Sequence, residues 1–269
     1  MSVAWRRSLA LAAGCLLYGA TAWAAVDTVD MTLREKTITL NIYRPALPEA
    51  QVPGVVFMAS GDVGWVGLAV SLSEYLRDQG YVVVGINSRQ YLAAFTSGKR
   101  HVMPDEVGGD YAAIAAFAHT QRVPPLPVIV SGVSEGAALS VLAASSAANH
   151  RWISGVITMG LPATAELAWR WSDFTSWITK KDASEPSFAA ADVIAGVAPL
   201  PLCLIQSTKD EYVTEQDYRA LEAAARDPKK LVLIEASNHR FTDKLPDLRR
   251  EYLAALAWIR GKSTQATRP

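Results

Sequence analysis

Short apolar runs alternate with stretches of helical periodicity along most of the chain. The apolar runs read as strands buried on both faces, and they cover residues 54–58, 81–86, 128–130, 153–159, 200–206 and 231–234. Between them, apolar residues or helix formers recur at helical spacing in residues 68–79, 104–121, 137–144, 215–226 and 245–260. Strands that alternate with helices favour a mostly parallel sheet covered on both faces, so the expected fold class is α/β.

Three stretches depart from this alternation. Residues 28–43 contain two polar/apolar alternating runs around residues 34–36, which predicts an antiparallel hairpin at a sheet edge. Residues 87–103 are expected to form a long loop. Residues 160–198 lie between two predicted strands and carry the aromatic residues Trp169, Trp171, Phe174 and Trp177. A lid or substrate-pocket insertion would have this composition, and so would an ordinary helix that packs its aromatic side chains against the sheet.

The first 24 residues have the pattern of a secretory signal peptide. Arg6 and Arg7 are followed by an apolar stretch over residues 8–21 and by the small-x-small site Ala22-Trp23-Ala24. We therefore expect a periplasmic mature protein that begins near Ala25, the alternative being a retained membrane anchor. The remaining length suits one domain over residues 25–262, with residues 263–269 as a loose tail.

Charge and cysteine content exclude several function classes. The chain has 26 basic and 26 acidic residues, and removal of the signal takes away two arginines and no acid, which leaves a net charge of −2. No basic field for nucleic acid is therefore expected. Cys203 would be the single cysteine of the mature chain, because Cys15 leaves with the signal, so no internal disulfide and no cysteine/histidine metal site is predicted.

The candidate nucleophile is Ser134, in the pentapeptide Gly132-Val133-Ser134-Glu135-Gly136. An apolar strand precedes this G-x-S-x-G motif and a stretch of helix formers follows it. Strand, sharp turn and helix are the setting of a nucleophile elbow, in which glycines flank the serine because the turn is too tight for side chains. The bare motif is common by chance, and its context makes it more specific.

A serine nucleophile needs a base that is oriented by an acid. His239 is the candidate base, because it lies directly after the last predicted strand and before the last helix. A surface loop histidine is the alternative. The acid is expected after the strand at 200–206, where Asp210 is favoured over the adjacent Glu211, although either residue could instead cap the following helix.

Backbone N–H groups that bind a developing oxyanion are expected at two places. One is the N–H of Glu135, directly after the nucleophile, and the other comes from the glycine-bearing loop at residues 60–64, with Gly61 and Asp62 as candidates. A plain glycine turn is the alternative for this loop. The Asp62 carboxylate would repel an oxyanion, so its side chain either turns away or binds a cationic part of the substrate.

Four stretches resemble the α/β-hydrolase superfamily and, within it, the AcvB/VirJ group of exported bacterial proteins. They are residues 59–65 (ASGDVGW), 85–91 (GINSRQY), the elbow at 132–136 and 237–241 (SNHRF). The second stretch is similar to a pocket-bordering segment of the group, which implies substrate-binding roles for Asn87 and Tyr91. The chain departs from the group at Glu135, where glycine or phenylalanine is more frequent, and at Val63, where a second glycine is.

The resemblance implies a periplasmic hydrolase that cleaves the aminoacyl ester of aminoacyl-phosphatidylglycerol, with Ser134 as nucleophile, His239 as base and Asp210 as acid. Asp62 and Glu135 would bind the ammonium group of the aminoacyl moiety, and Trp169 and Trp171 would help to admit the lipid. No cofactor is expected, and the substrate would be a membrane phospholipid. The alternatives are a generic carboxylesterase or lipase, and a non-catalytic accessory protein with a secretion-system partner.

Overall fold

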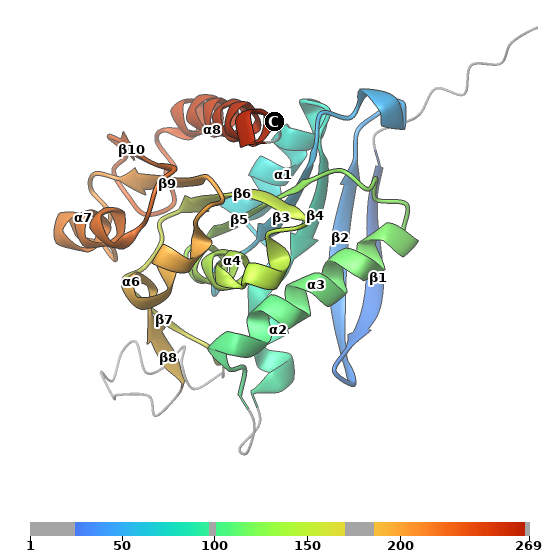
Figure 1. Cartoon of the computed structure of the whole chain (residues 1–269), viewed down its shortest axis with the longest axis horizontal. Coiled ribbons are helices and arrows are strands. Elements are labelled where there is room, and N and C mark those ends of the chain that lie inside the picture. Colours follow the sequence, from blue (N-terminus) through green and yellow to red (C-terminus); the bar gives the residue numbers. More distant parts are fainter. Residues whose placement is uncertain (1–24, 97–100, 170–185, 267–269) are drawn as a thin grey trace, which may run out of the picture.

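An eight-stranded, mostly parallel sheet forms the centre of the molecule (Figure 1), in a computed structural model that describes residues 25–96, 101–169 and 186–266. The strands, in spatial order, are β1 (Ala25–Leu33), β2 (Lys36–Arg44), β4 (Val82–Ile86), β3 (Val55–Ala59), β5 (Val128–Val133), β6 (Ile153–Met159), β9 (Leu202–Ser207) and β10 (Lys229–Ile234). The hairpin β1–β2 is antiparallel and lies at the sheet edge, as the alternating pattern predicts. From β4 to β10 all neighbours are parallel, which confirms the α/β fold class.

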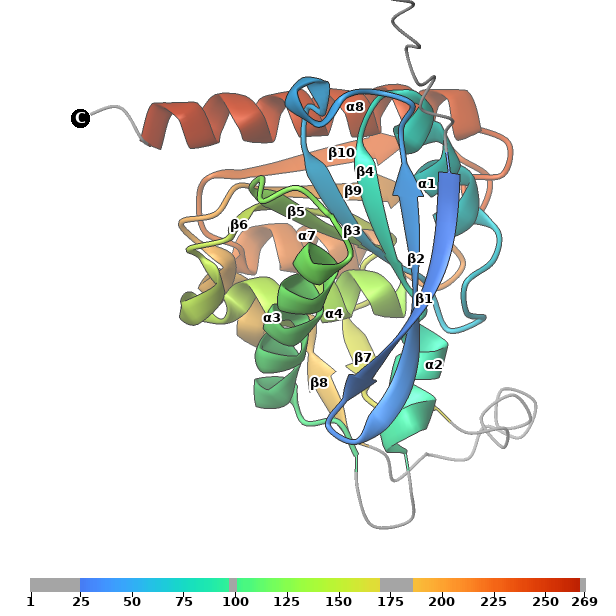
Figure 2. The ribbon, with the colours of Figure 1, turned by 90° about the vertical axis from the view of Figure 1, so that its right-hand side faces the viewer.

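Helices cover both faces of the sheet (Figures 1 and 2). Each face has its own hydrophobic core. One face carries α1 (Leu68–Asp78) and α8 (Leu245–Ala266), and the other carries α2 (Ser88–Phe95), α3 (Pro104–Thr120), α4 (Glu135–Ser145) and α7 (Glu215–Ala224). Side chains along a strand alternate between the faces. In β3, Val56 belongs to the core on the α1 and α8 side, whereas Phe57 belongs to the core on the α3 and α4 side.

Two predicted boundaries are wrong. Residues 88–95, expected as part of a loop, form α2, whose start is capped by the Asn87 side chain accepting a hydrogen bond from the Gln90 N–H at 3.1 Å. The expected tail at 263–269 is helical as far as Ala266. Ser263 ties this extension to the sheet, because its hydroxyl donates to the Ser154 carbonyl at 3.2 Å.

The aromatic-rich insertion contains a separate two-stranded antiparallel sheet. It pairs β7 (Thr164–Glu166) with β8 (Ser187–Ala189), and α6 (Ala190–Val193) follows β8 directly. Short 3₁₀ turns lie at η1 (Glu49–Gln51), η2 (Ala147–Asn149) and η3 (Ile194–Val197). The expected signal peptide and the aromatic residues Trp171, Phe174 and Trp177 of the expected lid lie outside the described residues.

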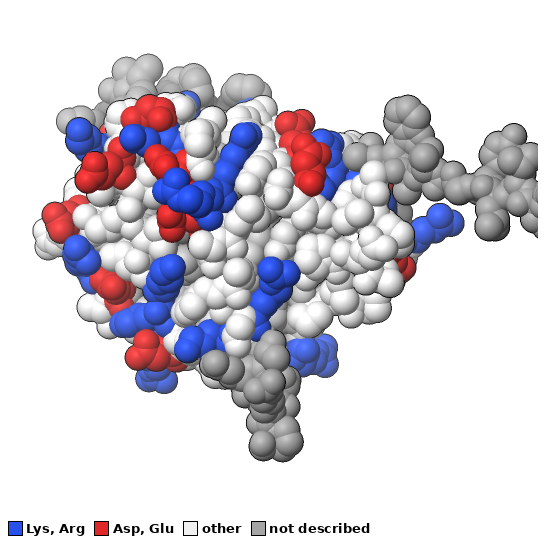
Figure 3. All heavy atoms as spheres, turned by 90° about the horizontal axis from the view of Figure 1, so that it is seen from above, with Lys and Arg blue, Asp and Glu red and all other residues white. Residues whose placement is uncertain are grey.

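The surface over α8 mixes both signs of charge. Figure 3 shows Lys and Arg side chains beside Asp and Glu side chains on this face. Arg250, for example, contacts both Asp247 and Glu251. Within the described ranges, no helix combines the length and the apolar character that a membrane crossing requires.

Candidate active site

Ser134 occupies a sharp turn between β5 and α4. Its backbone has φ 54° and ψ −120°, a strained conformation for a residue with a side chain. A Cβ on Gly132 would lie 2.1 Å from the Gly136 carbonyl carbon, and a Cβ on Gly136 would lie 2.3 Å from the Ser60 oxygen. Both glycines are therefore sterically required. The turn presents Ser134 at the carboxyl ends of the parallel strands, with the N-terminus of α4 behind it.

Asp210 and Glu211 hold His239 at two different points. The imidazole Nδ1 lies 2.7 Å from Asp210 Oδ2, and the Asp210 side chain is completely buried. The other Asp210 oxygen accepts the backbone N–H groups of Tyr212 and Val213 at 2.8 and 3.0 Å. Glu211 instead accepts the backbone N–H of His239 at 2.8 Å. Asp210 thus orients the ring, whereas Glu211 orients the loop that carries it.

The His239 ring is enclosed by residues that the sequence pattern does not indicate. Gly160, at the end of β6 with φ +60°, lies so close that a Cβ there would be 2.5 Å from His239 Cε1. The Tyr212 ring meets the imidazole edge-on, with centroids 5.2 Å apart. Among the described residues, no hydrogen-bond partner reaches the buried Nε2 of His239. A glycine after a strand is too common for its sequence position to reveal such a contact.

The loop after β3 brings Gly61 and Asp62 to the serine. A Cβ on Gly61 would stand 3.5 Å from Ser134 Cβ. The loop is fixed by Ser60, whose hydroxyl accepts the Ser88 N–H at 3.1 Å. It is also fixed by Trp65, whose indole N–H donates to the Tyr43 hydroxyl at 3.1 Å. The residues predicted for the oxyanion hole therefore lie together.

Glu135 folds its side chain back towards that loop. Its Oε2 accepts the backbone N–H of Asp62 at 3.1 Å. Burial, together with the negative charge on Asp62, raises the pKa of the Glu135 carboxyl, and hydrogen bonds from its own N–H, Ser134 and Asp62 partly oppose that rise. The sequence predicts an oxyanion-hole role for the Glu135 N–H but gives no sign that the side chain contacts the Asp62 N–H.

The other predicted substrate-binding residues have structural contacts. Asn87 caps α2, so its side-chain oxygen is already used. Tyr91 is only 1% exposed and its hydroxyl donates to Asp110 at 2.5 Å, which places it in the core rather than at a substrate pocket. Trp169 stacks under the Arg89 guanidinium, with 4.0 Å between Arg89 Cζ and the ring centroid. Trp171 is outside the described residues.

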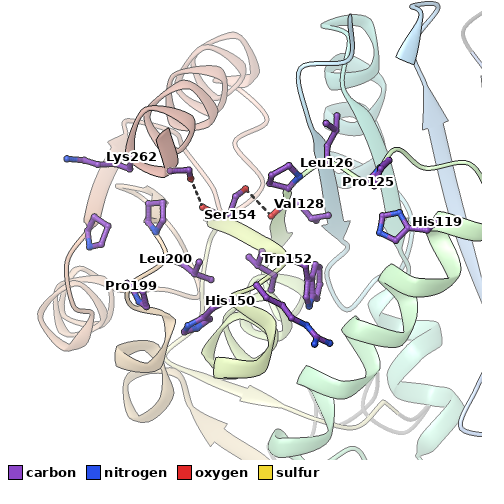
Figure 4. Close-up of a pocket in the computed structure, with 16 residues that line it drawn as sticks. His119, Pro125, Leu126, Val128, His150, Trp152, Ser154, Pro199, Leu200 and Lys262 are labelled. Atoms are coloured by element: carbon purple, nitrogen blue, oxygen red, sulfur yellow. Dashed lines mark hydrogen bonds between the residues drawn. The ribbon is translucent and has the colours of Figure 1, made fainter. Parts of the chain in front are cut away.

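A wide cavity lies at the amino ends of the parallel strands, whereas Ser134 lies at their carboxyl ends. It has a volume of about 700 Å³ and is lined by the segments that lead into β5, β6, β9 and β10 and by the end of α8. Figure 4 shows Leu126, Trp152 and Leu200 in its wall, with His150 and Lys262 at its sides. Ser134, Asp210 and His239 take no part in it, because they follow the carboxyl ends of their strands.

The comparisons with known proteins agree with this architecture. A family model described as "Bacterial virulence protein (VirJ)" matches residues 54–256. The uncharacterized protein YfhR of Escherichia coli K12 is 25% identical over 252 residues, which is 88% of this chain and 82% of YfhR.

Similar solved structures share the fold at low sequence identity. The esterase domain of a Rhodothermus marinus protein has a TM-score of 0.58 and 21% identity, over 87% of this chain and 98% of that one. A dienelactone hydrolase from Anabaena variabilis has a TM-score of 0.58 and 18% identity, over 86% and 95%. XC6422 from Xanthomonas campestris, a serine hydrolase without lid, has a TM-score of 0.56 and 19% identity, over 86% and 94%. These likenesses show an α/β-hydrolase fold.

Proposed function

This chain belongs to the VirJ family of bacterial virulence proteins, and we propose that it is a serine ester hydrolase in which Ser134, His239 and Asp210 form the catalytic triad. The observation that carries the proposal is the hydrogen bond from His239 to the fully buried Asp210 carboxylate, at the same sheet edge as the strained Ser134 turn. The order serine, acid, histidine along the chain is that of α/β-hydrolases.

The hydrogen bond to Asp210 assigns the proton of the neutral imidazole to Nδ1 and leaves Nε2 as the base. Nε2 takes the hydroxyl proton as Ser134 Oγ attacks the ester carbonyl. The backbone N–H groups of Glu135 and Asp62 bind the resulting oxyanion. Collapse of the tetrahedral intermediate breaks the ester bond, and His239 returns the proton to the leaving alcohol. Water, deprotonated by His239, then attacks the acyl carbon, and His239 returns the proton to Ser134 Oγ as the bond between Oγ and the acyl carbon breaks.

The substrate class we propose is aminoacylated phosphatidylglycerol at the periplasmic face of the membrane. Two features support it: the likeness to the AcvB/VirJ group, and two carboxylates beside the nucleophile, those of Asp62 and Glu135. An aminoacyl ester carries an ammonium group next to its carbonyl, and a carboxylate is the side chain that binds an ammonium best. A neutral acyl ester offers these carboxylates no counterpart.

The experiment is hydrolysis of lysyl- and alanyl-phosphatidylglycerol by the mature protein, beside p-nitrophenyl butyrate and a Ser134→Ala control. Cleavage of the aminoacyl lipids far above the small ester, with an inactive variant, would support both the mechanism and the substrate class. Turnover of the small ester alone would contradict the lipid assignment and leave the triad standing.

A generic carboxylesterase is the second candidate, favoured by the similar fold of the Rhodothermus marinus esterase domain and the dienelactone hydrolase. A non-catalytic accessory protein of a secretion system is the third candidate, because the matching family is described by virulence and not by an enzymatic activity. A fluorophosphonate probe separates the third from the others, because an activated Ser134 displaces fluoride from phosphorus and becomes labelled. Absence of labelling in a folded protein would favour the accessory role.

A further inference from the structure

The Glu135 carboxylate occupies the position where the oxyanion of a bound substrate is expected. Its Oε2 accepts the Asp62 N–H at 3.1 Å, and the carboxylate also interacts with its own backbone N–H and with the Ser134 hydroxyl. The two N–H groups are those predicted to form the oxyanion hole. A negatively charged oxygen that accepts the Asp62 N–H beside the nucleophile takes the place expected for the oxyanion of the tetrahedral intermediate.

The nucleophile and its candidate base are not hydrogen-bonded to each other in this structure. A serine is activated when its hydroxyl donates to the base. His239 Nε2, which should receive that proton, has no hydrogen-bond partner among the described residues, and the residue is only 5% exposed. The Ser134 hydroxyl interacts instead with the Glu135 carboxylate. In this arrangement the Asp62 N–H is already bound by Glu135, and His239 Nε2 receives no hydrogen bond from the Ser134 hydroxyl.

The negative charge of the Glu135 carboxylate is unfavourable in this position. Both burial of the Glu135 carboxyl and the neighbouring Asp62 carboxylate raise the pKa of Glu135, which means that its charged form is disfavoured where it lies. Asp62 is exposed, so an ion in solution or on a substrate can reach the pair. A cation that reached both carboxylates would stabilise the charge on Glu135 and give its side chain a better partner than the two N–H groups.

We propose that Glu135 is a specificity-determining residue that blocks the oxyanion hole of the free enzyme and is drawn out of it by the ammonium group of an aminoacyl substrate. This inference rests on the proposed function and deepens it. In an α-aminoacyl ester the ammonium nitrogen is bonded to the carbon next to the carbonyl. When that carbonyl oxygen enters the hole, the ammonium therefore comes close to the departing carboxylate.

The consequence is selection by charge rather than by pocket shape. A neutral acyl ester has no group that competes for the Glu135 carboxylate, so its carbonyl must displace an anion from the hole unaided. The developing oxyanion would then be repelled by that anion. An aminoacyl ester converts the same carboxylate into a binding group, and the freed Ser134 hydroxyl can turn to His239.

The test compares two esters that differ only in the ammonium group, alanine p-nitrophenyl ester and p-nitrophenyl propionate, in the mature protein and in Glu135→Ala. The substitution retains the backbone N–H of residue 135. We expect kcat/KM for the propionate ester to rise at least about tenfold and kcat/KM for the alanine ester to fall at least about tenfold. Glu74→Ala, at an exposed glutamate of α1, is the matched control and should change neither value.

A second measurement is the rate at which a fluorophosphonate labels Ser134. The probe is neutral and also places an oxygen in the oxyanion hole, so Glu135→Ala should be labelled faster than the parent. The inference would be overturned if Glu135→Ala unfolded at the same temperature as the parent but neither cleaved p-nitrophenyl propionate faster nor was labelled faster than the parent.

The two proposals fail separately. If the parent does not cleave aminoacyl-phosphatidylglycerol but Glu135→Ala shows both ester changes, the block stands and the lipid assignment falls. If the lipid is cleaved and the ester preference does not change, the block falls and the function stands.

Discussion

His239 is held at two points by neighbouring carboxylates, and loss of one contact should lower kcat far more than loss of the other. Asp210→Asn would present an amide N–H to Nδ1 and favour the wrong tautomer of the ring, so we expect kcat to fall by about 10⁴-fold. Glu211→Gln keeps an oxygen that accepts the His239 backbone N–H, and its kcat should fall by less than about tenfold. Turnover of p-nitrophenyl butyrate measures both. Equal losses in the two variants would show that Asp210 is not the orienting acid.

Gly160 should control the placement of the base. A methyl group there would collide with the imidazole, because the new Cβ would lie 2.5 Å from His239 Cε1. A displaced base lowers catalysis steeply, so Gly160→Ala should reduce kcat by about 10²-fold.

Gly67→Ala is the matched control for Gly160→Ala. Gly67 has a similar φ of +62° but no atom within 4 Å of the new Cβ, so it reproduces the backbone strain without the collision. If both variants lost activity equally, strain rather than contact with His239 would be the cause.

At the scale of elements, Arg34 joins the β1–β2 hairpin to two helices. Its guanidinium lies 2.7 Å from Glu106 and 2.7 Å from Asp110 of α3, and over the Phe95 ring of α2 at 4.0 Å. Asp110, with 5% of its side chain exposed, also accepts the Tyr91 hydroxyl. Arg34→Met would keep the apolar contact and leave Asp110 without a cation. Since Arg34 keeps 20% of its side chain exposed, we expect a loss of about 2 kcal/mol in the free energy of unfolding, below the value for a fully buried pair.

This loss should depend on pH. Burial is the main cause that raises the pKa of Asp110, and hydrogen bonds from Tyr91 and Arg34 oppose it. A raised pKa means that the folded state favours the protonated carboxyl, so stability is lost as pH rises through that pKa. Removing Arg34 raises the pKa further. Urea unfolding should therefore show a larger deficit at about pH 8 than at about pH 5. Arg77→Met, at the surface pair with Asp78, should cost less than about 1 kcal/mol at either pH.

The elements that sequence periodicity predicts well are those with continuous apolar runs. The strands β5, β6 and β9 lie where the pattern places them, because buried parallel strands have few polar positions to blur the signal. The helix α2 was missed, although Asn87 supplies an N-cap and Tyr91, Leu92 and Phe95 have helical spacing. It is short and follows a strand directly, so its pattern reads equally well as a loop.

The positions of Ser134, Asp210 and His239 could be predicted because each follows a strand end, and parallel strands bring their carboxyl ends to one edge. The contact of the Glu135 side chain with the Asp62 N–H could not be. It joins residues 73 apart in sequence and depends on a side-chain conformation that no local pattern encodes. The resemblance to a pocket-bordering segment implies a substrate-binding role for Tyr91, whereas its hydroxyl donates to Asp110 in a buried network.

At the scale of the whole molecule, the two ends of the sheet differ in role. The candidate site, with the carboxylates of Asp62 and Glu135 beside Ser134, lies at the carboxyl ends of the strands. The wide cavity of Figure 4 lies at their amino ends. Under the proposed function, a membrane lipid would approach the carboxyl ends of the strands, where Val63 and Tyr212 are 43% and 51% exposed beside the candidate site. The proposed periplasmic function also requires that the protein is exported across the inner membrane.

Export can be tested at the predicted cleavage site. If residues 1–24 are a signal peptide, the protein of the periplasmic fraction should have the mass of the chain from Ala25 to Pro269. Signal peptidase requires small residues on both sides of Trp23, so Ala22→Leu and Ala24→Leu should leave the precursor uncleaved in the membrane fraction. Trp23→Leu, at the tolerant middle position, is the control and should be processed normally. A parent protein that keeps residues 1–24 in the membrane fraction would show a retained anchor, and the hydrolase would then act from the membrane surface itself.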